Sequence, residues 1–225
     1  MNGAVLIKTY SEPQFNVREI LRYSGCREAD DEILRIIDEC VKECRKKFIY
    51  RVCYCELPVM QANGTTDLTF AETNSKALKK NLAGCRSIVL FAATIGIEID
   101  RLIAKYGRIS PTKALMFQAI GAERIESLCD LFNEDINNSY ASENLYTRPR
   151  FSPGYGDFPL EVQKDIFRVL DCPRKIGISL NDSLLMSPSK SVTAIIGISD
   201  KCASENGSSC TRCKKTDCKF RRTDK

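Results

Sequence analysis

The chain has 225 residues, which is enough for one large domain or two small ones, and its 28% charged residues are typical of a folded globular protein. It contains no histidine, which excludes Ser-His-Asp and Cys-His catalytic pairs and histidine ligands to zinc, haem or cobalt. Since neither a long apolar segment nor a signal-peptide pattern is present, we expect a cytoplasmic protein that makes no contact with a membrane.

The net charge of +5 is concentrated at the C-terminal end. Residues 200–225 carry eight Lys or Arg and four Asp or Glu, whereas the rest of the chain is nearly neutral. A basic tail is typical of some nucleic-acid-binding proteins, but no aromatic-rich basic strand or recognition-helix pattern accompanies it. Nucleic-acid binding is therefore a disfavoured alternative, and it would show as salt-dependent retention on DNA or RNA.

Apolar periodicity predicts two helices and a strand near the N-terminus. Residues 16–23 and 30–46 have helical spacing, and residues 48–56 alternate as in a strand. Cys53 and Cys55 are two positions apart and therefore lie on the same face of that strand. Their spacing suits packing better than a disulfide bond or a metal site.

Residues 63–106 are predicted to contain a turn, two helices and a strand that is apolar on both faces. The sequence predicts a turn at residues 63–64, a short extended run over 66–70 and a short helix over 75–82. Residues 86–95 then form an apolar run that we expect to be a central strand. Residues 97–106 are expected to be helical.

The longest predicted helix spans residues 111–138. Its acidic residues Glu123, Glu126, Asp130 and Glu134 recur at helical spacing, which is typical of a solvated face. Its apolar stripe, predicted to be buried, is Leu115, Ala119, Ala122, Ile125, Cys129, Phe132 and Ile136.

Residues 148–159 are too rich in Pro and Gly for a helix or strand, yet too aromatic and basic for a solvated linker. Their prolines stiffen the backbone, and Gly154 permits close approach of a ligand. Arg148 and Arg150 offer planar forks of donors for a carboxylate or phosphate, and Tyr155 offers a flat apolar face. The loop therefore suits a small anionic, ring-bearing ligand, and the alternative is an ordered connector whose arginines pair with surface acids.

The C-terminal third is predicted to contain one helix and a β-hairpin. Residues 159–170 are helical in pattern, with Pro159 at the first position. Residues 176–186 and 191–198 have strand-like patterns on either side of a turn, so we expect them to pair. Because helices and strands are mixed without regular alternation, the predicted fold class is α+β, with helices around a largely antiparallel twisted sheet.

Three motifs in the C-terminal half of the chain resemble the activation domain of cobalamin-dependent methionine synthase. Residues 150–155, Arg-Phe-Ser-Pro-Gly-Tyr, resemble the family signature Arg-Pro-Ala-Pro-Gly-Tyr. Residues 126–134 resemble its Glu-Ala-Phe-Ala-Glu-Tyr-Leu-His-Glu helix, and residues 177–194 resemble its Gly-to-Met strand, Pro-containing turn and Ser-Val-Ser-Gly segment. The resemblance covers residues 115–199, and the N-terminal third looks more like free-standing relatives of the domain.

The resemblance implies the fold of that domain, S-adenosylmethionine binding, and docking over a cobalamin-bearing partner. In the family, an electron donor and S-adenosylmethionine restore methylcobalamin after accidental oxidation to cob(II)alamin. By position, Arg150 would bind the methionine carboxylate and Glu126 would face the ammonium or sulfonium charge. The residues whose backbone or ring would contact the ligand are Ser152, Pro153, Gly154 and Tyr155.

The sequence departs from the family pattern at two places. Phe151 and Ser152 stand where the signature has Pro and Ala, which alters the rigidity of the loop. Residues 187–189, Ser-Pro-Ser, replace a Trp-Pro-Gly turn, which bears on the rim that faces cobalamin. An N-terminal aspartate that the large enzyme uses has no assigned counterpart.

Four of the twelve cysteines cluster in the basic tail, outside the family resemblance. A C-x2-C pair with two flanking cysteines presents four thiolates, which suits structural zinc or an iron–sulfur cluster. We favour a [4Fe–4S] cluster because reductive activation needs low-potential electrons, and the nearby lysines and arginines would attract an acidic electron-carrier protein. The alternative is a set of reduced thiols. The predicted ligands are Cys202, Cys210, Cys213 and Cys218.

The sequence therefore predicts an activation-domain-like α+β domain over residues 1–199 and a cysteine-rich metal-binding tail over residues 200–225. The predicted function is a free-standing reactivation subunit of a cobalamin-dependent methionine synthase, without a complete active site of its own. One alternative is an activator of another corrinoid methyltransferase. The other is a metal-stabilised interaction protein that does not bind S-adenosylmethionine.

Overall fold

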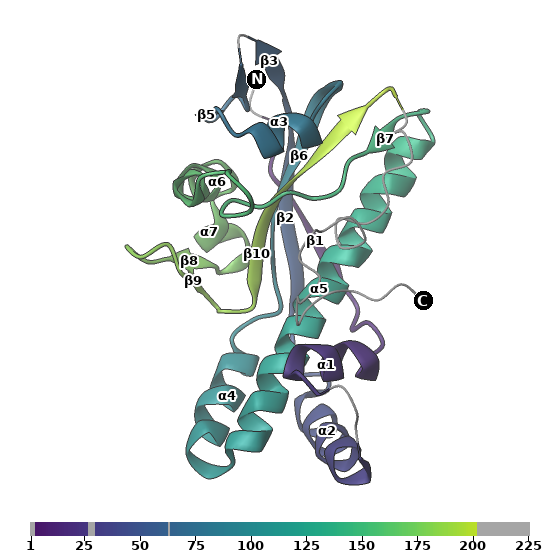
Figure 1. The fold of residues 1–225 in the computed structure, drawn as a ribbon, viewed down its shortest axis with the longest axis vertical. Helices are drawn as coiled ribbons and strands as arrows, with labels where there is room; N and C mark the ends of the chain where they lie inside the picture. Colours follow the sequence, from purple (N-terminus) through teal and green to yellow (C-terminus); the bar gives the residue numbers. More distant parts are fainter. Residues whose placement is uncertain (1–2, 27–29, 63, 202–225) are drawn as a thin grey trace.

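A five-stranded antiparallel sheet runs through the centre of the molecule (Figure 1). The computed structural model describes residues 3–26, 30–62 and 64–201. The strands lie in the order β1-β2-β6-β10-β7, and every neighbouring pair is antiparallel. The central position of β6 confirms the prediction for residues 86–95. These strands are β1 (Leu6–Tyr10), β2 (Tyr50–Pro58), β6 (Cys85–Thr94), β7 (Tyr146–Thr147) and β10 (Ser191–Ser199).

Helices cover both faces of this sheet, as an α+β fold requires. One face packs against α1 (Val17–Ser24), α2 (Asp31–Cys44), α4 (Glu98–Ile109) and the long α5 (Pro111–Ala141). The other face packs against α3 (Lys76–Asn81), α6 (Gln163–Leu170) and α7 (Cys172–Ile176), with the short 3-10 helix η1 (Leu160–Val162) leading into α6. Two small sheets complete the described elements, namely β3 (Met60–Ala62), β4 (Thr65–Asp67) and β5 (Glu72–Thr73), and β8 (Ser179–Leu180) with β9 (Met186–Ser187).

The two faces of the sheet define two separate hydrophobic cores. In β2, Tyr50 and Val52 belong to the core under α5, whereas Cys53, Cys55 and Leu57 belong to the core under α6 and α7. Alternate residues of a strand point to opposite faces, so a strand with helices on both sides carries apolar residues on both faces. The two cysteines therefore pack inside the protein, as their spacing predicts.

Polar side chains fix the starts of three helices on the α5 face. Asn16 Oδ1 accepts hydrogen bonds from the backbone N–H groups of Arg18 and Glu19, and Asp30 Oδ1 accepts one from Ile33 at 2.8 Å. Ser110 caps α5, which begins at Pro111. Such caps satisfy backbone donors that have no partner inside the helix. They explain why the predicted helix starts agree with the structure.

The predicted hairpin between residues 176–186 and 191–198 is wrong. Strand β10 pairs with β6 on one side and β7 on the other. Residues 179–187 instead fold back on themselves, because Leu184 adopts a positive φ of 62° and its N–H donates to Asn181 O at 2.9 Å. This local turn pairs β8 with β9.

Two details of α5 also differ from the expectation. Leu115, placed in the buried stripe, is 47% exposed, whereas Glu123, placed on the solvated face, is 2% exposed. Leu115 lies in the first turns of α5, before the buried stretch of the helix begins at Met116. Glu123 is buried because it forms an ion pair with Arg124, which is 0% exposed. Within the described residues, no helix is long and apolar enough to cross a membrane.

Replacing Gly197 with alanine is expected to destabilise the protein by about 1–3 kcal/mol through overpacking. A Cβ atom at this position in β10 would lie 2.6 Å from Cys85 Sγ and 2.7 Å from Leu82 Cδ2. Urea unfolding of Gly197→Ala measures the change. The matched control is Gly107→Ala in α4, where nothing lies within 4 Å of the added Cβ atom, so a gain of up to about 1 kcal/mol is expected there. An equal change in the free energy of unfolding for both variants would contradict the close packing at Gly197.

Candidate functional site

The loop of residues 148–159 runs from β7 to the start of η1 alongside β10 (Figure 1). The backbone N–H of Arg148 donates to Gly197 O at 2.8 Å. Phe151 and Ile195 exchange two backbone hydrogen bonds of 2.9 Å, which form an isolated β-bridge. The first half of the loop is therefore attached to the sheet and held in a defined position.

The tip of the loop is a chain of tight turns. The N–H of Gly154 donates to Phe158 O at 2.9 Å, and the N–H of Tyr155 donates to Ser152 O at 3.1 Å. Gly154 has a φ of 83°, which favours glycine because a side chain would strain the backbone there. Tyr155 is 59% exposed, and its ring packs edge-on against the buried ring of Phe151 at 5.3 Å between centroids. The turn thus presents Gly154 and an aromatic ring to solvent.

Asp157 attaches the far side of the loop to α3. Its carboxylate accepts hydrogen bonds from the hydroxyl of Ser75 at 2.5 Å and from the backbone N–H groups of Ala77 at 3.1 Å and Lys76 at 2.8 Å. These donors hold the pKa of Asp157 below its usual value. The loop is therefore anchored at both ends, by β10 on one side and by the first turn of α3 on the other.

The Asp157→Asn variant is expected to be less stable than the wild type at neutral pH, because a neutral amide is a weaker acceptor for three donors. The folded-state pKa is lowered, so the stabilisation is present above the unfolded pKa of about 4 and is lost as the pH falls through the folded value. Urea midpoints of both proteins between pH 7 and pH 2.5 measure this. The difference between the midpoints should narrow below pH 4, and a gap that stays constant would contradict the assignment.

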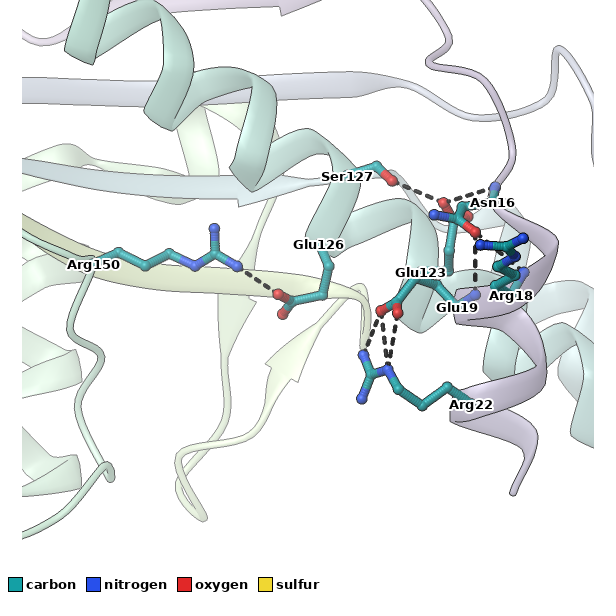
Figure 2. Close-up of polar contacts among 8 residues, drawn as sticks. All are labelled: Asn16, Arg18, Glu19, Arg22, Glu123, Glu126, Ser127 and Arg150. Carbon is teal, nitrogen blue, oxygen red and sulfur yellow. Dashed lines mark hydrogen bonds and ion pairs between the residues drawn. The ribbon is translucent and has the colours of Figure 1, made fainter. Parts of the chain in front are cut away.

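Arg150 reaches from the loop to two acids of α5. Figure 2 shows its contact with one of them, Glu126. Its Nη1 group donates to Asp130 Oδ1 at 2.8 Å, and its Nη2 group donates to Glu126 Oε2 at 2.5 Å. Residues four apart on a helix share a face, so one guanidinium can contact both. Burial opposes the charge of Arg150, but the neighbouring carboxylates contribute to a pKa above its ordinary value, so the side chain stays cationic.

A hollow of about 340 Å³ adjoins Arg150 between α5 and the start of the loop. This volume is at the lower end of the range of about 300–1,000 Å³ found for small-molecule sites. A second hollow of about 590 Å³ lies on the other side of the loop, beside Asp157. The residues that line the hollow beside Arg150 are Asn133, Glu134, Asn137, Thr147, Arg148, Pro149, Arg150 and Ile196.

The structure brings together two of the predicted ligand-binding side chains, Arg150 and Glu126. Residues 152–155 continue the same loop, and they are not among the residues that line the two hollows. Asp130 was only one of four acids in the sequence pattern, and its contact with Arg150 distinguishes it from Glu134. Asp130 and Arg150 are twenty residues apart and belong to different elements, so no sequence pattern predicts their contact.

The N-terminal segment meets α5 close to this site (Figure 2). Glu123 Oε1 accepts hydrogen bonds from the hydroxyl of Ser127 at 2.8 Å and from the backbone N–H of Asn16 at 3.3 Å. Arg124 Nη1 donates to Pro13 O at 2.6 Å. This buried network fixes the start of α1 against the same helix that carries Glu126.

The predicted metal ligands Cys202, Cys210, Cys213 and Cys218 lie outside the described residues. Residues 3–26, 30–62 and 64–201 contain no cluster of three or more His, Cys, Asp or Glu side chains arranged to hold a metal ion. The cysteines in these ranges are free thiols.

Comparisons with known proteins agree with this architecture. The sequence profile of the family described as "Vitamin B12 dependent methionine synthase, activation domain" matches residues 5–207. A solved structure described as "Crystal Structure of the MetH Reactivation Domain bound to AdoHcy" has the same fold, with a TM-score of 0.65, 16% sequence identity, and coverage of 90% of this chain and 81% of that chain. A search of curated proteins finds no significant match. The predicted fold class is confirmed, and the chain belongs to the family of vitamin B12-dependent methionine synthase activation domains.

Proposed function

We propose that the protein binds S-adenosylmethionine at the loop of residues 148–159 and presents its methyl group to cobalamin held by a partner protein. The observation that carries this proposal is Arg150, which lies beside a hollow and next to two acids in a member of this family. The similar solved domain was crystallised with AdoHcy, the demethylated form of the same ligand. The partner in this proposal is a cobalamin-dependent methionine synthase or a related corrinoid protein.

The charges of the site match those of the ligand. S-adenosylmethionine carries one carboxylate, one ammonium and one sulfonium group. The guanidinium of Arg150 suits the carboxylate, and Glu126 suits one of the cationic groups. Ser152 and Pro153 are half-buried and Gly154 is exposed. The exposed ring of Tyr155 offers a surface for the ligand to pack against.

The role of this chain in the chemistry is to bind and orient the ligand. The corrinoid supplies a reduced cobalt centre that accepts the methyl group, and an electron donor supplies the reducing equivalent. No general acid or base is needed to transfer a methyl group from a sulfonium ion, which suits a chain that lacks histidine. An anchored loop fixes the direction in which the methyl group points, and such orientation supplies much of the rate enhancement in a two-body reaction.

Calorimetric titration of S-adenosylmethionine into the purified chain tests ligand binding. We expect a single site that saturates, with a stoichiometry of one ligand per chain. A titration without heat at any temperature between 10 and 30 °C, together with the absence of ligand protection in a thermal melt, would favour the alternative of an interaction protein.

We also propose that residues 200–225 form a unit separate from the domain of residues 1–199, with a metal bound by Cys202, Cys210, Cys213 and Cys218. The support is the spacing of these cysteines in the sequence. Anaerobic purification followed by a visible spectrum and iron, sulfide and zinc analysis tests it. Iron and sulfide in equal amounts would support electron delivery, zinc would assign a structural role, and a metal-free tail would contradict the proposal.

A further inference from the structure

The guanidinium of Arg150 is shared between two carboxylates of α5. Nη1 donates to Asp130 and Nη2 donates to Glu126, so each terminal nitrogen of the fork contacts an acid. A ligand carboxylate that binds at Nη1 needs an N–H of the nitrogen that Asp130 contacts. A ligand carboxylate that approaches Arg150 there must therefore compete with an acid of the protein itself.

The two acids differ in how readily they can give up Arg150. The side chain of Asp130 is 53% exposed, whereas that of Glu126 is 32% exposed and that of Arg150 is 20% exposed. A half-exposed carboxylate regains water when it loses its partner, so its ion pair contributes little net free energy. Asp130 is therefore the easier of the two acids to displace.

Asp130 also lies on the side from which a ligand would arrive. Asn133 and Glu134, which line the hollow beside Arg150, follow Asp130 by three and four positions on α5. Residues at these spacings are neighbours on one helix face. A ligand in the hollow is thus adjacent to Arg150, beside the helix face that carries Asp130.

We propose that Asp130 is a specificity-determining residue that sets the affinity of this site for carboxylate-bearing ligands. In this structure Asp130 holds Arg150 in place, and on binding it yields Nη1 to the carboxylate of the ligand while Glu126 keeps Nη2. The identity of the ligand rests on the proposed function. The role of Asp130 as a competitor rests on the two hydrogen bonds that Arg150 makes in this structure.

The test is calorimetric titration of the Asp130→Asn variant with S-adenosylmethionine and with 5′-methylthioadenosine, which has no carboxylate. An amide is a weaker competitor for a guanidinium, so we expect S-adenosylmethionine to bind about three- to fivefold more tightly than to the wild type. The affinity for 5′-methylthioadenosine should not change. In an Arg150→Ala background, Asp130→Asn should give no gain.

The matched control is Asp38→Asn in α2. Asp38 is 58% exposed and pairs with Lys42, so it resembles Asp130 in chemistry and exposure. Its neighbour Glu39 pairs with Lys113 near the start of α5, which is about 25 Å along the helix from Asp130. At that distance salt screens the charge of Asp38 from the site. Asp38→Asn should therefore bind both ligands with the affinity of the wild type.

Two results would overturn the inference while the wild type still binds S-adenosylmethionine. One is weaker or unchanged binding of S-adenosylmethionine to Asp130→Asn, which would show that Asp130 does not compete with the ligand for Arg150. The other is an equal gain in affinity for S-adenosylmethionine and 5′-methylthioadenosine, which would show that the carboxylate of the ligand does not compete with Asp130. A wild type that binds neither ligand would overturn the proposed function, and this inference with it.

Discussion

The Arg124→Met variant is expected to lose about 3–5 kcal/mol of unfolding free energy, because it leaves a buried charge without its partner. Arg124 is 0% exposed, and its ion pair with Glu123, which is 2% exposed, is closed to solvent. Its guanidinium also donates to Pro13 O at 2.6 Å and to Gln14 O at 2.8 Å. The substitution therefore orphans a carboxylate and two backbone carbonyls at the junction of the N-terminal segment with α5.

Urea unfolding measures this loss, and two further variants show its cause. In the Glu123→Gln/Arg124→Met double variant the orphaned charge is gone, so it should be more stable than Arg124→Met by at least about 1 kcal/mol. Arg101→Met removes an exposed ion pair in α4, where the arginine side chain is 69% exposed, and should cost less than about 0.5 kcal/mol. A loss below about 1 kcal/mol for Arg124→Met would contradict the role given to this network.

The Arg150→Ala variant is expected to bind S-adenosylmethionine at least about 100-fold more weakly than the wild type, because truncating one partner of a hydrogen-bonded charge pair leaves the other unpaired. The ligand would lose its carboxylate partner, and the loop would lose its contact with Glu126. Arg150→Lys keeps the charge without the planar fork, so it should retain only part of the affinity. Calorimetric titration of the three proteins gives the comparison.

The control for this prediction is Arg174→Ala in α7. Arg174 is 86% exposed and pairs only loosely with Asp171, at 3.5 Å, so its removal should leave ligand affinity unchanged. Urea midpoints of all variants separate lost binding from lost folding. Arg150→Ala binding within threefold of the wild type would show that the ligand does not use this guanidinium.

Local sequence patterns predicted the elements that build the frame of the site. Residues 86–95 are apolar on both faces, which correctly placed β6 in the centre of the sheet. The 3–4 spacing of apolar residues predicted α5, and the Pro- and Gly-rich composition predicted an ordered loop over residues 148–159. These features depend on neighbours in the chain, so a single sequence contains their signal.

Contacts between distant segments were not predictable in the same way. Strand β1 was missed because Leu6 and Ile7 are about half exposed on an edge strand and show no buried alternation. Glu123 was assigned to a solvated face because its partner network includes backbone groups more than a hundred positions away. Such pairings are set by the tertiary fold, and sequence spacing does not encode them.

The most direct test of the account is methyl transfer to the corrinoid itself. The protein, the cobalamin-binding methionine synthase of the same organism in its cob(II)alamin form, and S-adenosylmethionine with a ¹³C-labelled methyl group are combined anaerobically with a low-potential reductant. We expect the visible spectrum of methylcobalamin to appear, with the label on cobalt, only when this chain is present and Arg150 is intact. A partner that stays as cob(II)alamin, although the chain binds S-adenosylmethionine, would contradict the account.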